Sequence, residues 1–156
     1  MSDSLKVTII IPCYNREDYI RECVMSALKQ TYENKEVIVV DNDSQDNSMK
    51  VIRDLERENS DLVVLSCPNI YAHSWQDPVE KALEVCTGEY FTIFGSDDYA
   101  EPDYLEKVMK YIQVNPDKIN FFQSPMKGVD HEGNPKGEML THSYRDLDHF
   151  KELLFQ

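Results

Sequence analysis

The 156-residue sequence has only four cysteines, and they are scattered singly along the chain. There is no CxxC pair and no histidine at metal-ligand spacing, which argues against a zinc site and against a disulfide framework. No run approaches the ~18 apolar residues of a membrane span, and the short apolar run near the start does not have the form of a signal peptide. These absences predict a soluble, cytoplasmic protein with reduced thiols.

The sequence also lacks a cluster of basic residues. Its net charge is -13 and its pI is about 4.6, whereas proteins that bind nucleic acids need a concentrated Lys and Arg surface. We therefore expect no nucleic-acid partner. An acidic chain can still bind a nucleotide when a divalent cation offsets the charge of the diphosphate. At 41% hydrophobic residues, a chain of this length is expected to form one domain with a real core.

Apolar runs typical of strands alternate with segments of helical spacing. Such alternation predicts an α/β fold, with a mainly parallel sheet and helices on both faces. The expected strands are 6–11, 36–40, 61–66, 90–94 and 118–123. Helices are expected at 17–30, around the apolar stripes at 51–55 and 79–86, and from a first turn that contains Pro102 to residues 115–116. A weaker helical pattern covers 144–155, and residues 129–134 are expected to form a hairpin-like turn.

Three of the expected strands end in polar clusters, at 12–16, 41–44 and 95–98. Ligands of open parallel sheets bind outside the carboxyl ends of the strands. Together the clusters would supply an aromatic ring, hydrogen-bond acceptors and ligands for a hard cation. The sequence therefore predicts a site for a nucleoside diphosphate and a metal at one edge of the sheet.

The residues at the first two strand ends each have an alternative interpretation. The ring of Tyr14 could stack on a nucleobase, or it could pack against a neighbouring loop. Asp41 and Asn42 could accept the imide N–H of uracil or thymine, or they could serve as turn and helix-capping residues.

The adjacent pair Asp97 and Asp98 is the clearest metal candidate. Two neighbouring carboxylates repel each other unless a cation or a hydrogen-bond donor offsets their charge, and Mg²⁺ or Mn²⁺ suits oxygen ligands. The alternative is that the pair caps the helix near Pro102 or faces solvent.

The order of these motifs closely resembles that of the family 2 glycosyltransferases, which have the GT-A fold, over roughly residues 5–112. The segments that carry the resemblance are 7–16, 27–32, 37–48, 88–90 and 96–98. The resemblance implies that Pro12, Tyr14, Asp41, Asn42, Ser96 and Asp97 bind the nucleotide, and that Asp97 with Asp98 binds a divalent cation, Mn²⁺ or Mg²⁺.

Three positions depart from the family pattern. Asn42 stands where a second carboxylate is usual, and Gly95 stands where the DXD motif usually has its first Asp. Val79-Glu80 aligns with an Arg-Asn pair of many members. These departures predict weaker nucleotide binding or a different donor.

The resemblance implies transfer of a sugar from a UDP- or dTDP-type donor to an acceptor hydroxyl, inverting and metal-dependent, in bacterial-type polysaccharide or glycolipid synthesis. The acceptor would be a glycan or a lipid-linked molecule. Association of the protein with the inner face of a membrane is left open. We expect residues 1–156 to form a single donor-binding domain that stops before the acceptor-binding half, with the general base beyond Gln156 and little transfer by this chain alone. The alternative function is a nucleotide-sugar-binding module or regulatory subunit without turnover.

Overall fold

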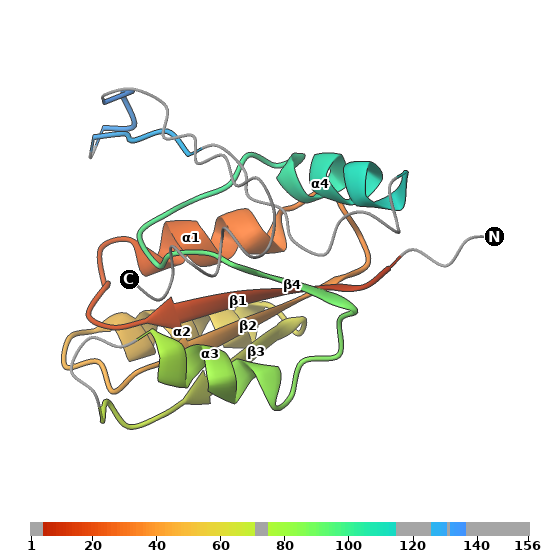
Figure 1. Cartoon of the computed structure of the whole chain (residues 1–156). Helices are drawn as coiled ribbons and strands as arrows, with labels where there is room; N and C mark the ends of the chain where they lie inside the picture. Colours follow the sequence, from red (N-terminus) through yellow and green to blue (C-terminus); the bar gives the residue numbers. More distant parts are fainter. Residues whose placement is uncertain (1–4, 71–74, 115–125, 131, 137–156) are drawn as a thin grey trace, which may run out of the picture. The chain divides into compact units, whose positions relative to one another are not determined.

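A computed structural model describes residues 5–70, 75–114, 126–130 and 132–136 (Figure 1). The chain divides into two compact units, Met1–Lys110 and Tyr111–Gln156. The strand expected at 118–123 and the helix expected at 144–155 lie outside the described residues. In the second unit, Val129 and Pro135 form an antiparallel bridge, and Gly133 has a φ of +83° between them. The turn predicted at 129–134 is thus confirmed for its described residues.

The first unit contains a four-stranded, fully parallel sheet with the order β3-β2-β1-β4. The central strands, β1 (Val7–Cys13) and β2 (Lys35–Asp41), are nearly continuous runs of buried apolar residues, as expected for strands covered on both faces. The outer strands are β3 (Leu62–Ser66) and β4 (Tyr90–Ile93), which are shorter and partly exposed. The predicted α/β fold with a parallel sheet is confirmed.

Helices cover both faces of this sheet (Figure 1). The helices α1 (Ile20–Leu28) and α2 (Ser48–Glu58) pack on one face, while α3 (Gln76–Leu83) packs on the other. A fourth helix, α4 (Tyr104–Gln113), follows β4. Two predicted starts were too early: residues 17–19 form a turn before α1, and Pro102 lies in the turn before α4 rather than inside the helix.

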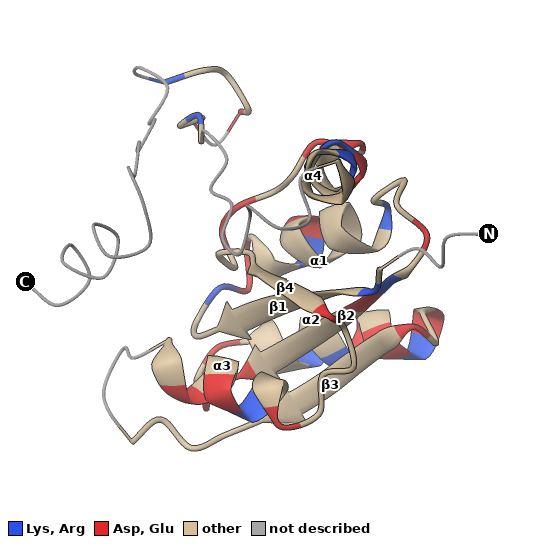
Figure 2. Ribbon diagram, turned by 45° about the vertical axis from the view of Figure 1, so that its right-hand side comes forward, with Lys and Arg blue, Asp and Glu red and all other residues tan. Residues whose placement is uncertain are grey.

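The core is built on the alternation of side chains along the strands. Ile10, Ile38 and Val40 point to the face covered by α3, where they pack with Val79 and Ala82. The intervening residues of β1 and β2 point to the opposite face and are also buried. Figure 2 shows Lys and Arg interspersed with Asp and Glu along the described helices.

The topology creates one switch point. The crossovers through α1 and α2 carry the chain from β1 outward to β3, and the crossover through α3 returns it on the other face to β4, on the far side of β1. Strand order therefore reverses beside β1. Open α/β sheets bind their ligands in the crevice outside the carboxyl ends of the strands at such a point.

Candidate functional site

The loop after β1 is tied to the loop after β2 by polar contacts. Asn15 has a φ of 51°, a left-handed conformation that Asn tolerates better than most residues. Its backbone N–H donates to Ser44 Oγ (3.0 Å), and its side-chain oxygen accepts from the N–H of Gln45 (2.7 Å). The N–H of Arg16 donates to Ser48 Oγ (2.7 Å). These bonds fix the backbone around Tyr14 at the edge of the sheet.

Asp41 and Asn42, at the end of β2, are both buried, with 3% and 2% of their surface exposed. One carboxylate oxygen of Asp41 accepts from the N–H of Ser44 (3.0 Å), and the other, Oδ1, is buried without a hydrogen-bond partner among the described residues. Asn42 is anchored by its N–H, which donates to the carbonyl of Cys13 (2.8 Å). Buried polar atoms rarely lack partners, and Asp41 Oδ1 is one of the few such atoms among the described residues.

The buried thiols of Cys13 and Cys23, next to the site, are expected to be unreactive. Burial, reinforced by the charge of Asp41, raises the pKa of Cys13 to about 12. Burial and the charge of Asp98 raise the pKa of Cys23 to about 12, and its thiol donates to the carbonyl of Gly95 (3.2 Å). Only the thiolate is a good nucleophile. The geometry therefore does not support cysteine-based catalysis here.

The cluster after β4 brings two carboxylates over Gly95. A Cβ atom at this position would lie 2.6 Å from Asp98 Oδ2 and 3.4 Å from Asp97 Oδ1. Burial, and then the charge of Asp97, raises the pKa of Asp98. Asp97 also forms an ion pair with Arg16 from the loop after β1 (Nε to Oδ2, 3.3 Å). The two acidic side chains thus crowd one small region at the switch point.

The donor set of this cluster fits a divalent cation that also has ligands from a substrate. Mg²⁺ is commonly held by one or two carboxylates together with substrate phosphates. Among the described residues there is no group of three or more His, Cys, Asp or Glu side chains that could hold an ion. Asp97 and Asp98 would therefore need oxygen atoms from a bound diphosphate to complete the coordination.

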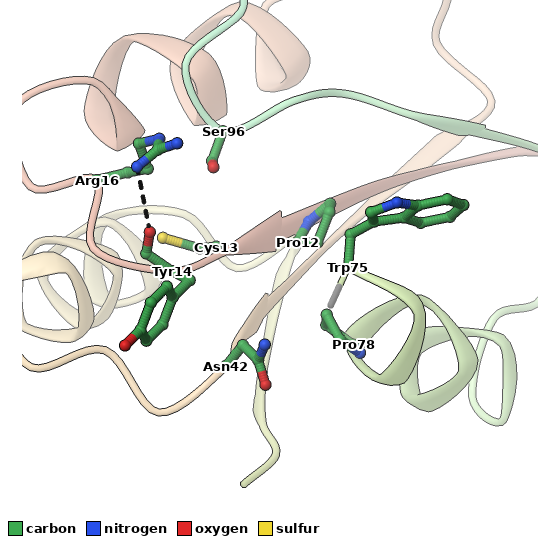
Figure 3. A pocket seen from close by; sticks show the side chains of 8 residues that line it. All are labelled: Pro12, Cys13, Tyr14, Arg16, Asn42, Trp75, Pro78 and Ser96. Carbon is green, nitrogen blue, oxygen red and sulfur yellow. Dashed lines mark hydrogen bonds between the residues drawn. The ribbon is translucent and has the colours of Figure 1, made fainter. Parts of the chain in front are cut away.

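A pocket opens between these strand ends. In Figure 3, Tyr14 lies on one side, Trp75 and Pro78 on the other, with Asn42 between them. Its volume of about 180 Å³ is below the 300–1,000 Å³ of complete small-molecule sites, so it can enclose part of a nucleotide sugar. The described residues of the lining are Pro12, Cys13, Tyr14, Arg16, Asn42, Trp75, Pro78 and Ser96.

The structure thus places four of the predicted residues, Pro12, Tyr14, Asn42 and Ser96, on one pocket wall. Asp41 lies outside the lining and holds the loop after β2, while Asp97 and Asp98 follow Ser96 at the same edge. Sequence reasoning assigned no role to Arg16 or Trp75. A signal for Trp75 did exist, because it directly precedes α3, and a helix that follows a parallel strand starts at the strand's carboxyl end.

Comparison with known proteins decides the family. The sequence model described as "Glycosyl transferase family 2" matches residues 8–155. The chain belongs to this family. The predicted resemblance is therefore confirmed, and the GT-A fold with it, because the similar solved structures are glycosyltransferases.

Two bacterial relatives illustrate the likeness of this family 2 chain. It is 30% identical over 146 residues to a poly(ribitol-phosphate) beta-glucosyltransferase of Bacillus spizizenii, covering 92% of this chain and 22% of that protein. It is 32% identical over 148 residues to a chondroitin synthase of Pasteurella multocida, covering 95% of this chain and 14% of that protein. The chain spans well under half the length of these curated relatives.

Solved structures agree with the fold of the family 2 chain. Staphylococcus aureus TarS 1-349 in complex with UDP-GlcNAc matches with a TM-score of 0.65 and 27% identity, over 79% of this chain and 38% of that one. The mannosyltransferase PcManGT of Pyrobaculum calidifontis, in complex with GDP-Man and Mn²⁺, matches with a TM-score of 0.63 and 26% identity, over 71% and 33%.

No described helix has the length and apolar character required to traverse a lipid bilayer.

Proposed function

We propose that the chain carries the donor site of a glycosyltransferase that moves a sugar from a UDP- or dTDP-type nucleotide sugar to an acceptor hydroxyl. The observation that carries this proposal is the pocket at the switch point, where Pro12, Tyr14 and Asn42 from two strand ends meet Ser96 from a third. TarS, a similar structure, has been solved with UDP and with UDP-GlcNAc. That likeness supports a uridine-type donor, whereas PcManGT was solved with GDP-Man, so the titration below includes GDP.

The nucleobase would occupy the space between Tyr14 and α3. A tyrosine ring offers a face on which a base can stack, and the amide of Asn42 can both donate to and accept from the edge of a pyrimidine. Asp41 would contribute from behind the wall, by holding the loop after β2 through its hydrogen bond from the N–H of Ser44. The small pocket volume suits a base and its ribose better than a complete donor.

Asp97 and Asp98 would hold a Mn²⁺ or Mg²⁺ ion against the diphosphate. When bound, such a cation stabilises negative charge on the departing diphosphate. Support comes from the crowding of the two carboxylates over Gly95 and from PcManGT, which was solved with Mn²⁺. The charge of the cation would also favour the ionised form of Asp98, whose pKa is raised by burial and by Asp97.

The reaction we propose is a single inverting displacement. The acceptor oxygen attacks the anomeric carbon from the side opposite the diphosphate, the bond from that carbon to the diphosphate breaks, and its electron pair leaves with the diphosphate. The proton of the acceptor hydroxyl passes to a carboxylate base, a role we assign to no described residue. The acceptor is proposed to be a glycan or a lipid-linked molecule of the cell envelope, in line with the polysaccharide-related names of the relatives. Association with the inner face of the membrane is part of the same proposal.

A second candidate is a nucleotide-sugar-binding module without turnover. It is favoured by Gly95, which occupies a position where a further carboxylate would strengthen cation binding. The two functions share the donor site and differ only in transfer. Binding and transfer must therefore be measured separately.

Calorimetric titration of the chain with UDP, dTDP, CDP and GDP, each with and without Mn²⁺, tests the donor site. We expect UDP or dTDP to bind best and Mn²⁺ to tighten the binding. Equal binding of all four nucleotides, or of none, would contradict the proposal. Incubation of the full-length protein with labelled UDP-sugars and a glycan or lipid-linked acceptor pool then separates the transferase from the binding module.

A further inference from the structure

Among the described residues that line the pocket, Arg16 is the only charged one. The other lining residues are neutral, and the chain as a whole carries a net charge of -13. A nucleoside diphosphate brings further negative charge into this surrounding. Of the described lining residues, only Arg16 brings a positive charge that can offset the charge of the diphosphate.

The backbone of Arg16 is fixed while its side chain is accessible. Its N–H donates to Ser48 Oγ (2.7 Å), and its carbonyl accepts from the N–H groups of Tyr19 (3.0 Å) and Ile20 (2.9 Å) at the start of α1. The side chain itself is 42% exposed. An arginine whose backbone is held by hydrogen bonds and whose guanidinium is solvated can change its side-chain conformation without disturbing the fold.

The guanidinium is only partly occupied by protein groups. Nε faces Asp97 Oδ2 (3.3 Å), and Nη1 donates to the carbonyls of Asn15 (3.0 Å) and Tyr14 (3.5 Å), the latter drawn in Figure 3. Nη2 donates to no residue that the structure describes. The nearby acids Glu17 and Asp46 accept hydrogen bonds from Asn47 and from backbone N–H groups of this loop. Asp97 is therefore the carboxylate that holds Arg16.

The pair between Arg16 and Asp97 competes with cation binding. While the guanidinium of Arg16 is paired with the carboxylate of Asp97, it partly neutralises that carboxylate and weakens its attraction for a divalent cation. Because both side chains are about half exposed, the pair contributes at most about 1 kcal/mol. A ligand that offers Arg16 a phosphate and Asp97 a cation can displace it, since bidentate phosphate contacts of arginine are stronger than exposed carboxylate pairs.

We propose that Arg16 binds the diphosphate of the donor and that its pair with Asp97 is exchanged on binding. Without ligand, Asp97 holds the guanidinium at the mouth of the pocket. With the nucleoside diphosphate bound, the guanidinium contacts the phosphate oxygens and Asp97 is released to the cation. This inference rests on the proposed function, because it requires a nucleoside diphosphate in the pocket.

The test uses Arg16→Gln and Arg16→Lys, titrated calorimetrically with UDP and with uridine in the absence of metal. We expect Arg16→Gln to weaken UDP binding about tenfold or more, as for the loss of a charged hydrogen bond, and to leave uridine binding unchanged. Arg16→Lys should recover part of the UDP affinity. Arg57→Gln is the matched control, because Arg57 lies on the exposed side of α2 and pairs with Asp54.

A second measurement uses Mn²⁺ alone, detected by its electron paramagnetic resonance signal. Removing the guanidinium frees Asp97, so Arg16→Gln should bind Mn²⁺ up to about fivefold more tightly than the parent chain. Opposite effects on UDP and on Mn²⁺ are not expected from a general loss of structure. Weaker Mn²⁺ binding would overturn the exchange.

Two results separate the failure of this inference from the failure of the proposed function. If the parent chain binds UDP and Arg16→Gln binds it equally well, or loses UDP and uridine to the same extent, the role of Arg16 is wrong and the donor site stands. If the parent chain binds no nucleoside diphosphate, both are wrong.

Discussion

At the scale of single residues, the candidate site divides into groups that face the pocket and groups that support it. Tyr14 and Asn42 belong to the pocket wall, whereas Asp41 is buried behind it and bonds the N–H of Ser44. Asp97 and Asp98 sit beside the pocket as a charged pair over Gly95. Substitutions in these groups should therefore affect different parts of a nucleotide ligand.

Tyr14→Ala should weaken binding of the nucleoside part of the ligand by about 1–3 kcal/mol, the range for stacking between a base and an aromatic ring. Tyr14→Phe keeps the ring and should bind nearly as well as the parent chain. Titrations with uridine and UDP measure the effect, and Tyr99→Ala, an exposed tyrosine outside the pocket lining, is the control. Unchanged affinity in Tyr14→Ala would return Tyr14 to a purely structural role.

Asp97→Ala should remove the tightening of UDP binding by Mn²⁺, because the cation loses a carboxylate ligand and Asp98 alone holds it poorly. Binding of uridine should not change. Calorimetry with and without Mn²⁺ measures the difference, and Asp103→Ala, an exposed acid before α4, is the matched control. If Mn²⁺ tightens UDP binding equally in both variants, the cation site lies elsewhere.

At the scale of secondary-structure elements, a second polar cluster joins three segments at the amino end of the sheet. Glu36 on β2 accepts from Thr8 on β1 (2.6 Å) and from the N–H and hydroxyl of Thr87 before β4 (2.6 and 2.7 Å). Lys6 completes it with an ion pair (2.8 Å). Burial by itself would raise the pKa of Glu36, but these partners outweigh it and lower the pKa to about 2.

This cluster predicts a specific dependence of stability on pH. The folded-state pKa of Glu36 lies below its ordinary value of 4.5, so its contribution to stability is fully present above pH 4.5 and is lost as the pH falls toward 2. The shift sets an upper limit of roughly 3 kcal/mol, which solvent screening of this partly exposed group reduces. Urea unfolding between pH 2 and 7 should show a smaller loss of stability on acidification in Glu36→Gln than in the parent chain. Glu58→Gln, an exposed acid at the end of α2, should follow the parent chain.

The elements also explain which predicted boundaries shifted. The N–H groups of Tyr19 and Ile20 bond back to the carbonyl of Arg16, which makes a turn of residues 17–19 and delays α1. The carbonyl of Pro102 accepts a hydrogen bond from the N–H of Thr31 (2.8 Å), a contact that connects the loop before α4 to the loop after α1. Hydropathy patterns in the sequence do not indicate such contacts.

At the scale of the whole molecule, the excess of acidic residues opposes the compact state. The net charge is -13 over 156 residues, and the ion pairs within α2 are local ones at three- and four-residue spacing. Repulsion among like charges is screened by salt. Folding stability should therefore depend on ionic strength.

Raising sodium chloride from about 10 to 200 mM, at which the Debye length falls well below 10 Å, should raise the Tm at pH 7. At pH 4.6, the pI of the sequence, the net charge is near zero and the same addition should change the Tm much less. Thermal unfolding followed by circular dichroism at the two pH values measures the difference. An equal rise at both would show that salt acts through something other than net charge.

The sequence by itself determined the α/β fold, the parallel sheet and the edge at which the polar residues gather. Runs such as Val37–Val40 are apolar enough to be buried on both faces, and parallel strands necessarily bring their carboxyl ends together. The motifs at Pro12, Asp41 and Asp97 could be placed along one edge for that reason alone. The family followed from the order of those motifs.

Only the tertiary structure decided which side chain of each motif faces the pocket. Asp41 and Asn42 are adjacent and similar in size, but Asp41 accepts a hydrogen bond from the N–H of Ser44 whereas Asn42 lines the pocket. Arg16 meets Asp97 across 81 residues of sequence, and Trp75 joins the lining because the α3 crossover returns on the opposite face. Such contacts depend on loop conformation and on the packing of separate elements, which local sequence patterns do not encode.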